Sequence, residues 1–173
     1  MNVFALKKIT SAHLNVLDNM LQLYAHEMNK FYNYSIVLDD NGRYRIKAAA
    51  KHLSDGWGYF IMASCEYAGF ILLNRRTKAK EGVFITEFFI LPRYRKGFFY
   101  RDVIVRLIAT LDGIVEYRVM KNNKRALCLF DDLVRRFLTT AKKTDEHENG
   151  SEYFRYTFDT ANITYNRSIG VIA

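Results

Sequence analysis

The residues whose types and spacing could do chemistry lie in the segment 84–106, FITEFFILPRYRKGFFYRDVIVR. An apolar run closed by a proline is followed by a short basic loop around Gly97 and then by a helix-like segment. The first backbone N–H groups of a helix have no partner inside it, and its dipole adds partial positive charge there. This segment could therefore bind the phosphates of a ligand, with charge from Arg95, Lys96 and Arg101 and close approach at the glycine. The alternative is that Gly97 only turns the chain into a surface helix whose basic face is solvated.

Length and composition limit what this segment could serve. The chain has 173 residues, 50% hydrophobic and 15% aromatic, which predicts one ordered domain with a sizeable core. No apolar run approaches the roughly 18 residues of a membrane-spanning helix, and residues 1–10 lack the apolar core of a signal peptide, so we expect a cytoplasmic protein without a membrane partner. Cys65 and Cys128 stand neither in a Cys-x-x-Cys pair nor near a histidine at metal-ligand spacing. We expect two core thiols, no disulfide and no metal site.

The net charge of +8 and the pI near 9.5 indicate an anionic partner, which could be a nucleic acid, an acidic protein or a phosphate-rich cofactor. Charge does not choose among these three.

The elements that must position the loop follow from residue spacing. Strands are predicted at 3–9, 57–64, 67–74, 83–91, 115–120 and 152–159, and helices at 10–31, 46–53, 100–111 and 122–140. Three consecutive strands followed by a helix favour an α/β (α+β) fold, with a mixed, mainly antiparallel central sheet flanked by helices. The charged segment 142–150 is predicted as an exposed turn. We expect a single domain over 1–173, with a core of about 3–160 and a tail at 161–173.

The segment 33–44 is predicted to be a loop with a partial strand, and it could border a substrate site. Its Asp39–Asp40 pair could bind a cationic substrate or a metal, but next to Asn41 and Gly42 the pair could equally be a solvated turn.

The central segments resemble the acyl-CoA-binding core of the GNAT superfamily of N-acetyltransferases. A bacterial subgroup has a strand Glu-Phe-Phe-Val-Leu, a loop Tyr-Arg-Arg-Lys-Gly-Ile-Gly and a later Asn-Asn-Lys-Pro-Ala-Leu. The matching residues here are Glu87-Phe88-Phe89-Ile90-Leu91, Tyr94-Arg95-Lys96-Gly97 and Asn122-Asn123-Lys124-Arg125-Ala126-Leu127. The strands containing Tyr67-Ala68-Gly69-Phe70 and Tyr153-Phe154-Arg155-Tyr156 also stand in the expected order.

This resemblance implies an acetyl-CoA site and a catalytic base. The implied cofactor-binding residues are Phe89, Ile90, Leu91, Arg95, Lys96, Gly97, Phe98, Phe99, Tyr100 and Asn123. Glu87 takes the position of the general base that removes a proton from the acceptor ammonium. Its alternative is an outward-facing glutamate or one satisfied by a neighbouring cation. Asn123 resembles the asparagine that contacts the pantetheine or phosphate arm, and it could instead, or also, cap the next helix.

Two departures from the family pattern concern the loop and the acid. The loop aligned on Gly97 is one residue shorter, and Phe99 stands at the second glycine position, where a phenyl group could block the pyrophosphate or change the loop path. The tyrosine that acts as the acid in the family corresponds to Phe130, which has no hydroxyl. Possible substitutes are Tyr94, Tyr100 and Tyr117.

The resemblance therefore predicts an enzyme, an N-acetyltransferase that transfers the acetyl group of acetyl-CoA to a primary amine by direct attack. The acceptor could be a small molecule, a protein amine or an aminoacyl-tRNA; the basic charge disfavours a free polycation and favours an acidic macromolecule. A homodimer is possible.

Two rival functions stay open. One is a catalytically degenerate GNAT fold that binds a protein partner. The other is an RNA- or DNA-binding module, for which aromatic residues could stack on bases. The basic residues that suggest it are Arg75, Arg76, Lys78, Lys80, Arg93, Arg95, Lys96, Lys142 and Lys143.

Overall fold

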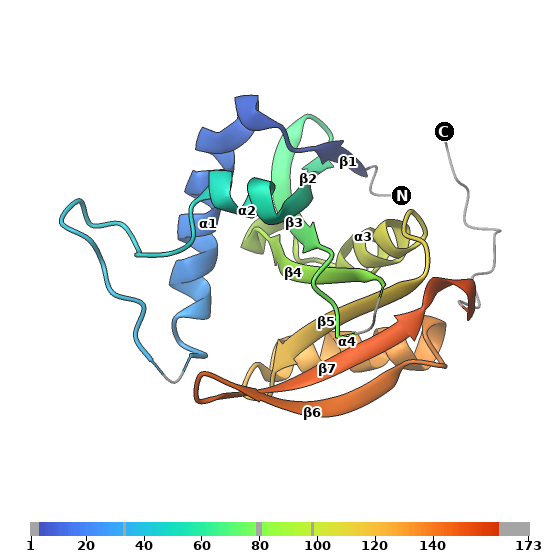
Figure 1. Cartoon of the computed structure of the whole chain (residues 1–173). Helices are drawn as coiled ribbons and strands as arrows, with labels where there is room; N and C mark the ends of the chain where they lie inside the picture. The colour runs from blue at the N-terminus through green and yellow to red at the C-terminus, as the bar shows by residue number, and fades with distance from the viewer. Residues whose placement is uncertain (1–3, 33, 79–80, 98, 163–173) are drawn as a thin grey trace.

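Seven strands of the described chain form one sheet in the order β1-β2-β3-β4-β5-β7-β6. The structure, a computed structural model, describes residues 4–32, 34–78, 81–97 and 99–162 (Figure 1). The strands are β1 Phe4–Lys8, β2 Gly56–Ala63, β3 Glu66–Asn74, β4 Val83–Ile90, β5 Ile114–Met120, β6 Lys142–Glu148 and β7 Ser151–Asp159. The helices are α1 Leu14–Met28, α2 Ala49–Asp55, α3 Phe99–Ile108 and α4 Lys124–Phe137, with short 3-10 turns at Ser11–His13, Pro92–Tyr94 and Thr160–Asn162. None of the described helices is long and apolar enough to cross a membrane.

The helices cover both faces of the sheet, which confirms the predicted mixed, mainly antiparallel architecture (Figure 1). One core lies under α1 and α2 and includes Leu17, Leu21, Phe60, Phe70 and Phe89. The other lies under α3 and α4 and includes Ile71, Val103, Leu107, Phe130 and Tyr156. The predicted elements are observed with shifts of a few residues at their ends.

The expected exposed turn at 142–150 is wrong. Lys142–Glu148 forms β6, an edge strand that pairs antiparallel with β7 over its whole length. The turn is confined to Asn149 and Gly150, whose φ angles are 49° and 75°. Charged side chains are common on edge strands, since they discourage pairing with other chains. The charge of this segment therefore does not indicate a loop.

The expected core position of the two cysteines is also wrong. Cys65, in the turn between β2 and β3, and Cys128, on the outer side of α4, are both free and exposed.

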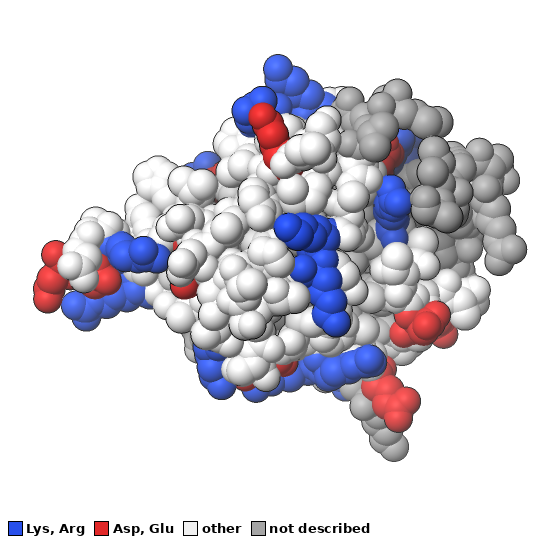
Figure 2. Space-filling view, turned by 90° about the horizontal axis from the view of Figure 1, so that it is seen from above, with Lys and Arg blue, Asp and Glu red and all other residues white. Residues whose placement is uncertain are grey.

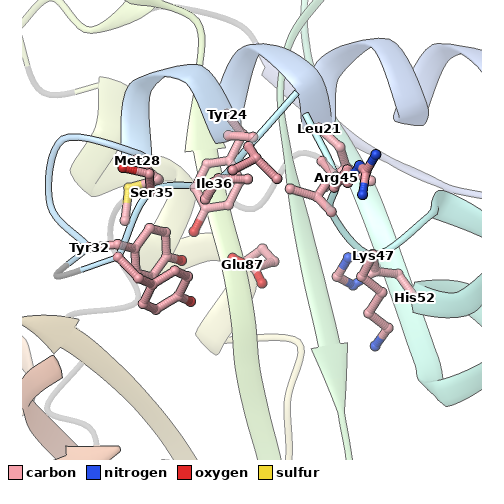
Figure 3. Close-up of a pocket in the computed structure, with 14 residues that line it drawn as sticks. Leu21, Tyr24, Met28, Tyr32, Ser35, Ile36, Arg45, Lys47, His52 and Glu87 are labelled. Carbon is pink, nitrogen blue, oxygen red and sulfur yellow. The ribbon is translucent and has the colours of Figure 1, made fainter. Parts of the chain in front are cut away.

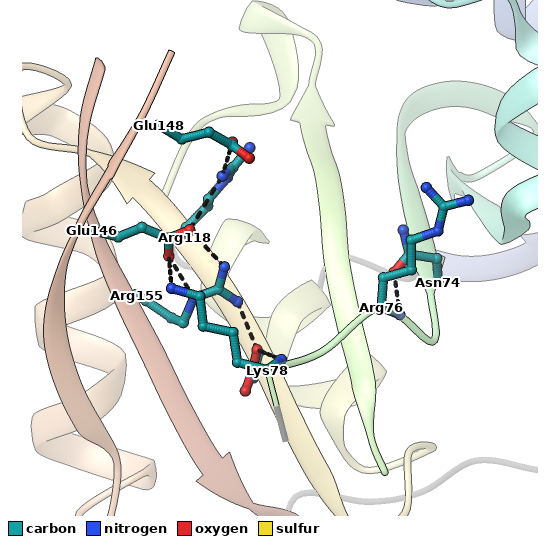
Figure 4. A network of polar contacts seen from close by, with 8 residues as sticks. Asn74, Arg76, Lys78, Arg118, Glu146, Glu148 and Arg155 are labelled. Atoms are coloured by element: carbon teal, nitrogen blue, oxygen red, sulfur yellow. Dashed lines mark hydrogen bonds and ion pairs between the residues drawn. The ribbon is translucent and has the colours of Figure 1, made fainter. Parts of the chain in front are cut away.

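Ion pairs cover the face of β5, β7 and β6 that points away from α4 (Figure 4). The guanidinium of Arg155, which is 7% exposed, lies 2.6 Å from Glu116 and also pairs with Glu146. The backbone N–H of Lys78, in the connection between β3 and β4, donates to Glu116 at 3.0 Å. Arg118 pairs with Glu146 and with Glu148. This network ties the β3–β4 connection to the second half of the sheet.

Candidate functional site

A β-bulge at Thr86 decides which way Glu87 points. In the ladder between β3 and β4, Leu72 pairs with Glu87 but Leu73 pairs with Ile85, so Thr86 is an extra residue in β4. Ile85 belongs to the core under α3 and α4. Strand side chains alternate, so without the bulge Glu87 would join that core; the extra residue turns it to the face covered by α1.

Glu87 lies in a cavity of about 360 Å³ between β4, α1, α2 and the segment that joins the two helices (Figure 3). Tyr24 points from α1 toward Glu87 (Figure 3). The remaining lining residues are Leu21, Ala25, Met28, Tyr32, Tyr34, Ser35, Ile36, Val37, Arg45, Ile46, Lys47 and His52. Residues 34–37 of the loop after α1 thus line this cavity, and its use as a substrate site stays a prediction.

The environment of Glu87 suits a proton acceptor. Burial raises the pKa of Glu87 to about 7, although a hydrogen bond with Tyr24 and the positive charges of Arg118 and Lys47 act to lower it. A base that is half ionised near neutral pH combines availability with proton affinity. The nearby phenol of Tyr24 stays protonated, since burial and the charge of Glu87 raise its pKa well above the usual value.

The parallel strands β4 and β5 separate beside this cavity. Their ladder has three pairs and ends at Ile85 opposite Tyr117. In the described strands, β4 continues to Ile90 and β5 to Met120 without further pairing between them. The edge of β4 that faces β5 is therefore open beyond the bulge, and its backbone groups can bind an extended ligand that carries amides.

The loop after β4 has the expected turn at Gly97. Gly97 is exposed with φ of +58°, a left-handed conformation that favours glycine, and α3 begins two residues later at Phe99. A Cβ at this position would meet no heavy atom within 4 Å, so the space beside the backbone is open. Lys96 is also exposed.

Arg95 is engaged inside the protein. Its Nη1 and Nη2 atoms donate to the two carboxylate oxygens of Glu27 on α1, each at 2.7 Å, and its Nε donates to the carbonyl oxygen of Ile90. Burial alone would raise the pKa of Glu27, but the hydrogen bonds and charge of Arg95 outweigh it and hold that pKa below its usual value. The side chain thus fastens the loop to α1, and its charge is balanced within the protein.

Phe99 does not fill the mouth of the loop. Its side chain is 4% exposed and packs against Phe4 and Tyr94, with ring centroids 5.6 and 6.2 Å apart. Phe89 and Ile90 are likewise buried and Leu91 is half-buried, so only their backbones can face a ligand; the carbonyl oxygen of Ile90 already accepts from Arg95, and the N–H of Leu91 donates to the carbonyl oxygen of Ala68. Phe98 lies outside the described residues.

Asn122 and Asn123 follow β5, and Asn122 connects this end of β5 to the residues after α1. Asn123 caps α4, since its Oδ1 accepts the backbone N–H of Ala126 at 3.2 Å. Asn122 donates from Nδ2 to the carbonyl oxygen of Phe31 at 2.6 Å. The end of α1 therefore contacts the chain after β4 through Glu27 and the chain after β5 through Phe31.

The three tyrosines considered as acids differ in their surroundings. The hydroxyl of Tyr94 donates to the exposed Glu66. Tyr117 is 2% exposed, and its hydroxyl is buried without a partner among the described residues. Tyr100 is half-buried on the first turn of α3, with its ring 4.8 Å from Phe88 and 6.1 Å from Phe130. Of the three, Tyr100 is therefore the tyrosine whose ring packs against β4 beyond the bulge.

The Asp39–Asp40 pair forms a turn. Asp39 Oδ1 accepts the backbone N–H groups of Asn41 and Arg43, each at 2.9 Å. No cluster of three or more possible metal ligands occurs within 4–32, 34–78, 81–97 and 99–162.

Sequence reasoning missed the residues that surround Glu87 in the cavity. Tyr24 lies in the predicted helix 10–31 among apolar residues, and its one signal is that the hydroxyl of a buried tyrosine needs a partner. Arg45, Lys47 and His52 carry no motif, and they line the same cavity as Glu87 only because α2 and the segment before it fold over β4.

Comparison with solved structures places this architecture in the GNAT fold. An acetyltransferase of the GNAT family from Bacillus cereus superimposes with a TM-score of 0.57 at 10% identity, over 91% of this chain and 97% of that one. The ribosomal-protein-S18-alanine N-acetyltransferase of Escherichia coli gives 0.60 at 10% identity, over 91% and 94%. A spermidine/spermine N-acetyltransferase of Vibrio cholerae gives 0.57 at 14% identity, over 91% and 93%. No family model and no curated protein sequence matches the chain. The likeness is one of fold.

Proposed function

We propose that the protein is an acetyl-CoA-dependent N-acetyltransferase that acts on a primary amine by direct attack. The observation that carries this proposal is the bulge at Thr86, which turns Glu87 into a cavity beside the point where β4 and β5 separate. A fold by itself does not define an activity, so the proposal depends on this site.

Acetyl-CoA would supply the acetyl thioester, and the overall reaction breaks the C–S bond, forms a C–N bond and releases one proton. Glu87 would take a proton from the acceptor ammonium, directly or through water, to give the nucleophilic amine. Its pKa of about 7 keeps a large fraction ionised at neutral pH. Tyr24 would hold the carboxylate in place through their hydrogen bond.

The residues after Glu87 support a site for coenzyme A. We assign the pantetheine amides to the backbone edge of β4 up to Ile90, as an added strand would pair there, with the carbonyl oxygen of Ile90 exchanging its bond from Arg95 for one from the ligand. We assign the pyrophosphate to the backbone at Lys96, Gly97 and the first turn of α3, because the start of a helix favours an anion. Arg95 would act by fixing this loop to Glu27.

Tyr100 is our candidate for protonating the leaving thiolate. Burial raises its pKa well above the usual value, so the hydroxyl stays protonated and can donate. It lies beside Phe130, the position at which the family resemblance places a tyrosine. A hydroxyl would thus still be present on this side of the open strands, but it would come from α3 instead of α4.

A nucleic-acid-binding function receives less support. Figure 2 shows Lys and Arg side chains in separate groups divided by uncharged surface. Five of the basic residues that suggested this function form ion pairs with carboxylates: Arg76 with Asp55, Lys78 with Glu146, Arg93 with Glu66, Arg95 with Glu27 and Lys143 with Asp131. Paired cations are less available to phosphates.

Thiol release from acetyl-CoA in the presence of a panel of primary amines tests the proposal. Glu87→Gln should lower kcat/KM by about 10²–10⁴-fold, the usual contribution of a general base, with acetyl-CoA affinity unchanged. Glu81→Gln is the matched control, because Glu81 is an exposed carboxylate just before the same strand. Acetyl-CoA binding without turnover of any amine would favour a degenerate binding protein. Full activity of Glu87→Gln would exclude Glu87 as the base.

A further inference from the structure

We infer that the acceptor is a small amine that carries an anionic group, held by Arg45 while its amine lies at Glu87. This inference rests on the proposed acetyltransferase function and names its substrate class.

The charges around the cavity are unequal. Of the described residues that line it, Glu87 alone carries a carboxylate, whereas Arg45 and Lys47 are cationic. His52 contributes no charge at neutral pH, because burial and then Lys47 lower its pKa to about 4. One carboxylate binds one ammonium, and the remaining cations call for a negative group on the same ligand.

Lys47 and Arg45 differ in whether a carboxylate of the protein already pairs with them. Lys47 Nζ lies 2.9 Å from a carboxylate oxygen of Asp55, which also pairs with Lys51 at 3.0 Å. The guanidinium of Arg45 is exposed and forms no hydrogen bond or ion pair in the part of the chain that the structure describes, although its charge helps to lower the pKa of Asp39. Its backbone is fixed, since its N–H donates to the carbonyl oxygen of Val37 at 2.9 Å. Arg45 is thus the cation that a ligand can use, and a guanidinium suits a bidentate carboxylate or phosphate.

The carboxylate that would bind the amine and the cations that would bind the anionic group lie in different parts of the cavity. Glu87 lies in the middle, Arg45, Lys47 and His52 lie on the side of α2, and Tyr32 lies on the opposite side (Figure 3). Apolar and aromatic side chains fill the remaining wall, among them Leu21, Met28, Ile36 and Ile46. A volume of about 360 Å³ is at the small end of ligand sites. These features fit an amino-acid-like molecule with an apolar body.

A polyamine does not fit this arrangement. A further ammonium of such a molecule would find no second carboxylate in the described cavity wall, and near Arg45 and Lys47 it would meet like charge. The spermidine/spermine N-acetyltransferase that shares the fold is named for such an acceptor. The difference between the two proteins would thus lie in the cavity wall.

Acetyl transfer to L-phenylalanine, phenethylamine and spermidine tests the inference, with rates expressed per concentration of unprotonated amine. The first two share a ring and an amine and differ by the carboxylate. We expect kcat/KM at least tenfold higher for L-phenylalanine than for phenethylamine, and lowest for spermidine. Comparing kcat/KM for phosphoethanolamine and ethanolamine tests whether a phosphate group has the same effect as a carboxylate. Arg45→Glu should remove the preference while leaving acetyl-CoA affinity unchanged. Arg43→Glu, on the same exposed turn but outside the cavity wall, should keep it.

The outcomes separate this inference from the proposed function. If the wild-type protein transfers acetyl groups but prefers phenethylamine or spermidine, or if Arg45→Glu keeps the preference, the inference is wrong and the acetyltransferase stands. Turnover of a neutral peptide amine, but of no small anionic amine, also overturns it. If no amine is acetylated and acetyl-CoA does not bind, the proposed function fails and the inference with it.

Discussion

Replacing Glu87 with glutamine should make the protein more stable at alkaline pH, although it should remove activity. Burial raises the pKa of Glu87 from 4.5 to about 7 in the folded protein, against the effects of Tyr24, Arg118 and Lys47. Above pH 7 the folded protein must therefore hold an ionised carboxylate in a half-buried site, whereas the unfolded chain solvates it freely. For an acid with a raised pKa, the destabilisation is absent below the unfolded-state pKa, grows between the two values and is constant above the folded-state pKa.

The magnitude follows from the shift. A difference of about 2.5 pH units corresponds to about 3 kcal/mol at 1.36 kcal/mol per unit, and partial exposure at the cavity mouth reduces it to about 2–3 kcal/mol. Glu87→Gln should thus gain about 2–3 kcal/mol in free energy of unfolding relative to wild type between pH 4.5 and pH 8.5.

Urea denaturation at the two pH values, followed by the fluorescence of Trp57, measures this gain. Trp57 is the single tryptophan and is half-buried in β2. Glu81→Gln should track the wild-type protein at both pH values. An equal pH dependence for Glu87→Gln and Glu81→Gln, or a loss of stability of Glu87→Gln at pH 8.5, would refute the account of Glu87.

Three further predictions concern other parts of the site and its support. Tyr100→Phe should lower kcat by about 10²-fold at alkaline pH with little change in KM, while Tyr94→Phe should leave kcat unchanged; steady-state kinetics with two amines decide this. Arg155→Leu should cost about 3–5 kcal/mol in urea denaturation, because it removes the buried guanidinium that Glu116 and Glu146 share, whereas Arg135→Leu at an exposed ion pair should cost less than about 1 kcal/mol. Asn123→Ala should cost about 1 kcal/mol by removing the cap of α4, and Asn123→Asp, which keeps the acceptor, should cost less.

The loop and most elements could be predicted because their signals are local. Strand, proline, basic glycine turn and helix are read from neighbouring residues, and Gly97 adopts the positive φ that such a turn needs. The strand β6 was missed because its residues are almost all charged and exposed, as is common for a strand at the edge of a sheet. Its one buried side chain, Glu146, is paired with Arg155 of the neighbouring strand, and this pairing cannot be read from nearby residues.

The surroundings of Glu87 could not be predicted, because they depend on contacts between distant segments. The bulge at Thr86 is defined only by the register against β3, and it alone decides which face Glu87 joins. The charge of Arg95 could not be assigned either, since its partner Glu27 stands 68 residues earlier. Sequence named the base candidate, and tertiary structure determines its pKa and its neighbours.

The measurement that tests the central claim most directly is calorimetric titration with acetyl-CoA of the wild-type protein, Gly97→Glu and Gly113→Glu. Both glycines have positive φ and open space beside them, so the two variants carry the same strain and charge at different places. We predict micromolar binding, about −8 kcal/mol, for wild type and Gly113→Glu, and no binding for Gly97→Glu, whose carboxylate would stand where the phosphates lie. No heat from the folded wild-type protein, or equal binding by Gly97→Glu, would contradict the account.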